Sequence, residues 1–252
     1  EPHLIPMISR NKGFLSLEFL VPILAFIFST IVVEATYRLY VTPNATEFMV
    51  KRKLLMSQGS NSEVIRERPL YIIVKDAEPK YEIIFCLWGM IILGYKLAHI
   101  TRERRLFSFD FVRIQPGERI IPEDAIDRYK ELKTAVEGES RWRDRLLPEC
   151  LLAALHRFHA SSSIQDAATA IRERAELAAD RLDSSLSLVR YIAWAIPAIG
   201  FIGTVRGIGD ALSFAEQAIK GDISSLTANL GLAFISTFVG LMLCIVLMYV
   251  LH

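Results

Sequence analysis

Four long runs of mostly apolar residues constrain this chain more than any other feature of its sequence. A helix needs roughly 20 apolar residues to cross the hydrocarbon core of a bilayer, which is about 30 Å thick. The runs occupy residues 14–41, 82–100, 188–214 and 226–252 of a 252-residue chain in which 52% of the residues are hydrophobic. The sequence therefore predicts an all-α, polytopic membrane protein with about four transmembrane helices.

The first run admits two further interpretations. Arg10 and Lys12 precede it, as in a signal peptide, but its apolar body is longer than the roughly 7–15 residues of a signal-peptide core. It could also lie on the membrane surface or form a re-entrant hairpin, because the segment 42–81 that follows carries basic residues that usually stay in the cytoplasm. In that last case three spans would remain.

Basic residues near the span ends predict the orientation. Arg102, Arg104 and Arg105 follow the second run directly, so this end is expected to be cytoplasmic, and both chain ends then lie in the cytoplasm. Between and before the four spans, the predicted segments are an N-terminal segment (1–13), an extracytoplasmic segment (42–81), a cytoplasmic helical domain (101–187) and an outer turn (215–225).

One uninterrupted helix is expected to lead from the cytoplasmic domain into the third span. No proline or glycine occurs from Ile164 until Pro197, and Ser163 followed by Asp166 resembles a capping box at the helix start. About 50 residues at 1.5 Å each give a helix roughly 75 Å long, of which only about half fits in a bilayer. Its narrow apolar seam suits packing within the chain or against other copies equally well.

Shorter helices are expected earlier in the cytoplasmic domain. Pro122 lies at the start of one, and its apolar stripe includes Tyr129 and Leu132. His156 and His159 are three residues apart on the next, but no further ligands follow at a zinc-motif spacing, so no metal site is predicted.

Several functional classes find no support. Cys86, Cys150 and Cys244 have no CxxC spacing and are expected to be reduced thiols. The net charge of +1 comes from intermixed acids and bases, and no basic patch suggests nucleic acid as a partner. Phosphate-binding GxxxxGK[ST], HExxH and GxSxG motifs are missing, which disfavours an enzyme.

The third and fourth runs contain small residues at helix-packing intervals. Gly200, Gly203 and Gly207 lie on nearly one face of the third, and Gly240 belongs to a similar face of the fourth. Membrane helices associate by close backbone approach at such residues, so these two helices are expected to pack.

Polar residues at membrane depth require a separate explanation. A hydroxyl of Thr204, Ser236 or Thr237 could bond back to its own helix, or the three could form a polar seam between the helices. Arg206 could pair with Asp210 four residues later, extend to the membrane surface, or take part directly in ion passage. Neither run has a central Asp or Glu, so the titrating group of any proton relay is expected to come from another polypeptide.

From Ile196 the chain reads IPAIGFIGTVRGIGDALSF, then Gly221 and Asp222, then LTANLGLAFISTFVGL. With these motifs, the segment 188–242 resembles the signature of the MotA/TolQ/ExbB proton-channel family. The family has a small-residue LGLLGTVxG helix, a turn with GD, and a helix of the pattern GxxxALxTTxxGL. Ser236 replaces the first threonine of the TT pair, and Arg206 stands where members often have an apolar residue.

This resemblance implies an ion-driven rotary motor in the bacterial inner membrane, without a cofactor, in which H+ is the expected transported ion and Na+ is the alternative. A homo-pentamer would surround two copies of a single-span partner of the MotB/TolR/ExbD type, which carries the titrating aspartate, with lipid outside. Pro197, Thr204 and Thr237 would face the ion pathway, beside Ser236. The alternative is a passive oligomeric membrane scaffold without ion conduction.

The driven task stays open at this point. The GTV motif is closer to TolQ and ExbB, whereas four spans with a short outer turn are closer to MotA. Because the sequence stops while still helical, a C-terminal cytoplasmic tail is expected beyond it, and a long tail would indicate the ZorA type of antiphage defence. Flagellar rotation, outer-membrane energising and gliding are the other candidate tasks.

Overall fold

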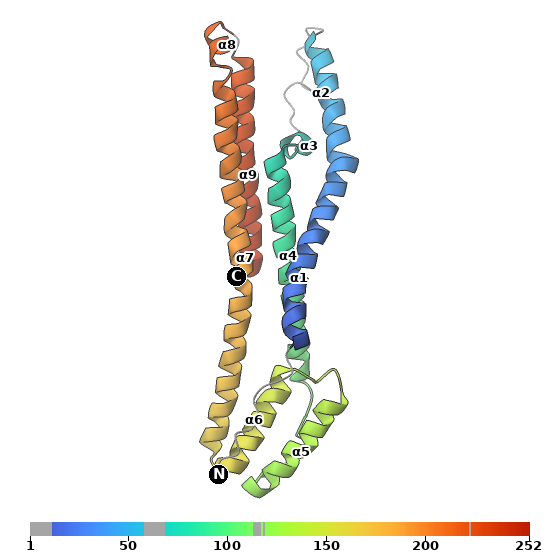
Figure 1. The fold of residues 1–252 in the computed structure, drawn as a ribbon, viewed down its shortest axis with the longest axis vertical. Helices are drawn as coiled ribbons and strands as arrows, with labels where there is room; N and C mark the ends of the chain where they lie inside the picture. Colours follow the sequence, from blue (N-terminus) through green and yellow to red (C-terminus); the bar gives the residue numbers. More distant parts are fainter. Residues whose placement is uncertain (1–11, 58–68, 113–116, 118, 222) are drawn as a thin grey trace. The chain divides into compact units, whose positions relative to one another are not determined.

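The structure, a computed structural model, describes residues 12–57, 69–112, 117, 119–221 and 223–252 (Figure 1). Every regular element in these ranges is a helix. Four helices are long and apolar enough to cross a membrane: Leu20–Lys51, Ala77–Leu106, Ile164–Leu212 and Ser225–Leu251. The predicted all-α class and the four candidate spans are therefore confirmed. The chain divides into two compact units, residues 1–94 with 188–252, and residues 95–187.

The first span is longer than its apolar run. Helix α1 (Lys12–Thr36) passes through the π-helical turn η1 (Tyr37–Val41) into α2 (Thr42–Ser57), so helix continues well into the segment expected to be extracytoplasmic. The π turn lies just before Pro43, whose missing N–H cannot make a regular helical bond. A shift of the hydrogen-bond pattern at this point lets the helix continue.

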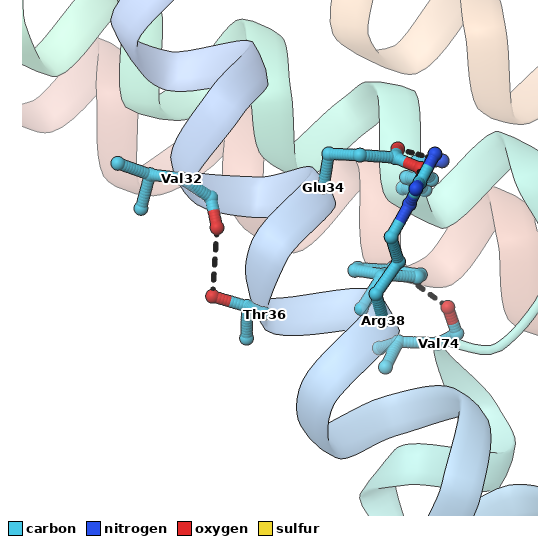
Figure 2. Close-up of polar contacts among 7 residues, drawn as sticks. Val32, Glu34, Thr36, Arg38 and Val74 are labelled. Carbon is cyan, nitrogen blue, oxygen red and sulfur yellow. Dashed lines mark hydrogen bonds and ion pairs between the residues drawn. The ribbon is translucent and has the colours of Figure 1, made fainter.

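Polar side chains on α1 find partners on their own helix and on α4 (Ala77–Leu106). Figure 2 shows the hydroxyl of Thr36 donating to the carbonyl of Val32 at 2.8 Å, and Glu34 accepting from Arg38 at 3.0 Å. Glu34 also contacts the ammonium group of Lys80. Such pairing lowers the cost of polar groups within a span.

Helix α4 (Ala77–Leu106) packs against α1 and η1. The indole of Trp88 donates to the carbonyl of Pro22 at 2.8 Å, and the ring of Phe26 lies edge-on to it at 4.9 Å. The phenol of Tyr37 donates at 2.7 Å to the carbonyl of Val74, which follows the short helix α3 (Leu70–Ile73). Helix α4 starts before the apolar run that begins at Glu82, so this glutamate lies inside the helix.

The remaining helices are α7 (Ile164–Leu212), α8 (Ala215–Ile219) and α9 (Ser224–Leu251). The long helix predicted from Ile164 is confirmed as α7. The hydroxyl of Ser163 accepts from the backbone N–H of Asp166 at 3.3 Å, as a cap requires. The chain turns after α8 at Gly221, whose φ of +100° favours glycine. Asp222 and residues 1–11 of the predicted N-terminal segment lie outside the described residues.

The second unit is built on a helical hairpin of α5 (Pro122–Gly138) and α6 (Leu146–Ser161). Its core consists of Ala125, Leu132 and Leu155. The carboxylate of Glu103 accepts from the guanidinium of Arg145 at 3.0 Å and from the first backbone N–H of α6 at 3.3 Å. A negative charge at a helix N-terminus is stabilising, so this contact helps fix where α6 begins.

Candidate ion pathway

Glycines let α7 approach α9 closely. A Cβ atom added to Gly207 would lie 2.6 Å from Cβ of Ala233, and one on Gly200 would lie 3.0 Å from Cα of Thr237. On Gly203 it would overlap the hydroxyl of Ser236. These distances are shorter than van der Waals contact, so only glycine fits without movement of the neighbours. The spacing of these three glycines in the sequence had predicted that this face of α7 packs against the fourth span.

Thr204 and Thr237 contact each other across this packed seam. The hydroxyl of Thr204 lies 3.1 Å from the carbonyl of Ala233, and that of Thr237 lies 3.0 Å from the carbonyl of Gly200. Each hydroxyl thus reaches the carbonyl four residues before the other threonine. Thr204 is also 3.2 Å from the carbonyl of Gly200 on its own helix, whereas the contact of Thr237 crosses to the neighbouring helix. The two hydroxyls also contact each other directly.

Pro197 lies two helical turns before Thr204, on the same side of α7. The helix continues through Pro197, but proline cannot donate to the carbonyl of Ala193 four residues earlier. The thiol of Cys244 on α9 donates to that carbonyl at 3.2 Å. A residue from the neighbouring helix therefore satisfies the acceptor that Pro197 leaves free.

Arg206 pairs with Glu78 of α4. Nη1 lies 2.9 Å from Oε1, and Nη2 lies 2.9 Å from Oε2, which is a two-pronged guanidinium–carboxylate contact. The side chain of Glu78 is 11% exposed and that of Arg206 is 56% exposed. The sequence had offered Asp210 as one possible partner, beside extension to the membrane surface and a role in ion passage. In the structure the acid that pairs with Arg206 is not Asp210 but Glu78, more than a hundred residues earlier.

Glu82 brings a carboxyl group between α7 and α9, and sequence reasoning missed it. Its side chain is completely buried, and within the described part of the chain neither carboxyl oxygen has a hydrogen-bond partner. Cβ atoms added to Gly200 and Gly240 would lie 2.8 and 3.1 Å from Oε1. The available signal was the i, i+4 spacing of Glu78 and Glu82, which places both acids on one face of α4.

A cavity of about 150 Å³ lies beside the Arg206–Glu78 pair. Asp76, Asp210, Asn229 and Ser236 are among its lining residues. Burial raises the pKa of the Asp76 carboxyl, and Lys75 opposes this shift. The hydroxyl of Ser236 is buried and, among the described residues, makes no hydrogen bond. Part of the polar lining can therefore accept or donate further hydrogen bonds.

Metal-ligating side chains do not gather anywhere in the described ranges. The ring of His159 lies 2.8 Å from the carbonyl of Pro122, and the ring of His156 packs on that of Tyr129 at 5.7 Å. Both histidines therefore have structural contacts in the second unit. The three cysteines are free.

The long apolar helices and the glycine-packed polar seam define a polytopic helical membrane protein. Residues 143–252 match the model of the MotA/TolQ/ExbB proton channel family. The match includes Thr204 and Thr237, whereas Glu78 and Glu82 lie outside it. No curated protein and no solved structure matches the chain. Members of the family are channel components and work with a MotB/ExbD-like partner in membrane complexes.

Proposed function

We propose that this chain is the pore-wall subunit of an ion-driven rotary motor in the bacterial inner membrane, with both chain ends in the cytoplasm. Five copies surround two copies of a single-span partner, and an aspartate in the partner's membrane helix binds and releases the ion. The transported ion is H+, with Na+ as the second candidate. The observation that carries this proposal is the hydroxyl pair of Thr204 and Thr237 on the packed face of α7 and α9.

The chemistry of this pair suits ion transfer. A threonine hydroxyl has one proton to donate and two lone pairs, so the pair can bond a carboxylate, a water or a hydronium ion without titrating. Both threonines are only half buried in a single copy, which leaves part of each accessible. Pro197 and Ser236 belong to the same wall, one on each helix.

Energy enters through the membrane potential. One charge that crosses 100 mV provides about 2.3 kcal/mol, enough to shift a balanced two-state packing roughly fifty-fold. A ring of five subunits and a core of two helices cannot match at every interface, so each ion transfer favours a new position of the ring. The rotation would drive one of the candidate tasks, antiphage defence of the ZorA type among them.

A passive oligomeric scaffold is the rival function. Large apolar side chains remain exposed on α7 and α9, Phe201 and Phe238 among them, and both functions use such surfaces against lipid or neighbouring copies. The scaffold needs no hydroxyl pair and no partner with a membrane carboxylate.

The test is the mass of the intact membrane complex, purified after co-expression with a single-span protein encoded by the neighbouring gene. We expect a mass equal to five copies of this chain and two of the partner. We also expect the ion-driven activity of this complex to be abolished by uncouplers, which dissipate the proton gradient. An oligomer of this chain that binds no such protein and is insensitive to uncouplers would establish the scaffold instead.

A further inference from the structure

We propose that Glu82 is a proton-binding site of this chain, and that it holds a proton when α4, α7 and α9 are packed as in this structure. It releases the proton to water when the packing opens, and rebinds one when the packing closes. This inference rests on the proposed ion-driven function and adds a titrating carboxyl group to the one that the partner supplies.

The first argument is the shape of the site. The carboxyl group of Glu82 occupies a slot formed by two glycines, one on each neighbouring helix. A Cβ atom on Gly200 would lie 2.8 Å from its Oε1, and one on Gly240 would lie 3.1 Å from Oε1 and 3.2 Å from the carboxyl carbon. Absent side chains at Gly200 and Gly240 therefore make the room that this carboxyl needs.

The second argument is the lack of a compensating charge. The guanidinium of Arg206 is already engaged by both oxygens of Glu78, and the ammonium of Lys80 contacts Glu34. Among the described residues neither oxygen of Glu82 has any hydrogen-bond partner. An ionised carboxylate that is buried without a partner at membrane depth is strongly disfavoured, whereas a neutral carboxylic acid is tolerated.

Other titratable groups around Glu82 do not replace that missing charge. Glu78 lies one turn earlier on α4 and would repel a second negative charge, and Cys86 lies one turn later. On η1, the phenol of Tyr37 already donates to the carbonyl of Val74. Along this contact α9 presents Ser236, Thr237 and Gly240, none of which carries a charge.

The third argument is that the slot around the carboxyl is lined by backbone carbonyl oxygens, which can accept a hydrogen bond but cannot stabilise a negative charge. A Cβ atom added to Gly240 would lie 3.1 Å from Oε1 of Glu82 and 3.3 Å from the carbonyl oxygen of Ile196. A Cβ atom added to Gly200 would lie 3.1 Å from the carbonyl oxygen of Ser236. A helical carbonyl keeps a second lone pair for such a bond. Backbone carbonyls on both neighbouring helices therefore line the slot that holds this carboxyl group.

The cavity gives the proton a route to water. Ser236 lines the cavity with its unpartnered hydroxyl, and its backbone carbonyl faces the slot that holds Glu82. A small separation of α7 and α9 would thus admit water to the carboxyl. The proton leaves as hydronium, and the resulting carboxylate is solvated by the entering water until it is protonated again.

The test uses the full chain with its partner in proteoliposomes, and compares wild type, Glu82→Gln, Glu82→Asp and the exposed control Glu131→Gln. Infrared difference spectra at neutral pH report the carbonyl stretch of a protonated carboxylic acid, which shifts in D2O. We expect Glu82→Gln to assemble normally, to lose one such band, and to lower proton flux at least tenfold. Glu82→Asp should recover part of the flux, and Glu131→Gln should match wild type.

Two results would overturn the inference. Wild-type flux in Glu82→Gln would show that the carboxyl is structural, and an unchanged carboxylic-acid band would show that Glu82 is ionised. If Glu82→Gln does not assemble, Glu82→Asp decides: the inference requires it to keep the acid band and measurable flux, and the loss of both contradicts it. A wild-type complex that conducts no ions would instead contradict the proposed function, whereas the infrared band tests the protonation of Glu82 independently.

Discussion

Arg206 on α7 and Glu78 on α4 form a two-pronged ion pair, with both nitrogen–oxygen distances at 2.9 Å. The pair joins the part of the chain that matches the channel-family model to a helix outside that match. It also gives Arg206 a partner whose presence requires no role in ion passage.

Loss of this pair should destabilise the first unit. Arg206→Ala leaves the largely buried carboxylate of Glu78 without its partner, and we expect a cost of about 1–2 kcal/mol, reduced by the exposure of Arg206. Thermal unfolding in detergent of Arg206→Ala, Glu78→Gln and the double variant measures the coupling. The exposed pair Lys130–Asp127 is the control. We expect the coupling free energy of this exposed pair to be smaller than that of Arg206–Glu78. Fully additive effects of the two substitutions at Arg206 and Glu78 would contradict the pairing.

Glycine substitutions separate helix packing from helix propensity. Gly207→Ala should destabilise the contact between α7 and α9, because its Cβ would lie 2.6 Å from that of Ala233. A cost of about 1–3 kcal/mol is typical of such overpacking. Gly209→Ala is the matched control on the same helix, where an added Cβ meets no atom within 4 Å, and should be neutral or stabilising. Equal melting temperatures for the two variants would refute this packing.

Asp76 predicts a pH dependence of stability. Because burial raises the pKa of its carboxyl in the folded protein, the folded state binds a proton more tightly than the unfolded state. The resulting stabilisation is present below the unfolded pKa and is lost as pH rises through the folded pKa. The melting temperature of the wild type should therefore fall between acidic and neutral pH, and this fall should be smaller in Asp76→Asn. An unchanged drop in Asp76→Asn would exclude Asp76 as its source.

The hairpin of the second unit depends on Leu132. This side chain is 3% exposed and packs with Leu155, so Leu132→Ala should cost about 2–4 kcal/mol. Amide hydrogen exchange in the intact protein should rise across α5 and α6. Lys133→Ala, at the exposed neighbouring position, should leave exchange nearly unchanged. If both variants exchange alike, Leu132 is not central to this core.

Local sequence patterns predicted the features that depend on nearby residues. Apolar runs indicated four spans, the lack of breakers after Ile164 indicated α7, and the spacing of Gly200, Gly203 and Gly207 indicated its packing face. Each of these signals lies within one continuous stretch of the sequence.

The contacts of α4 could not be predicted in the same way. Pairing of Arg206 with Glu78 joins residues 128 apart, and no periodic pattern encodes which helices become neighbours. An apolar-run criterion placed the start of the second span at Glu82, so both glutamates appeared to belong to its polar border. The structure begins α4 at Ala77 and thereby buries Glu82 inside the helix packing.

The most direct test of the central claim is proton flux through proteoliposomes that contain the chain and its single-span partner, with Thr237 replaced. Thr237→Val removes the hydroxyl at nearly constant shape, and we expect normal assembly with flux reduced at least tenfold, whereas Thr237→Ser should retain most of it. Wild-type flux through correctly assembled Thr237→Val would contradict the claim that this hydroxyl pair lines the ion pathway.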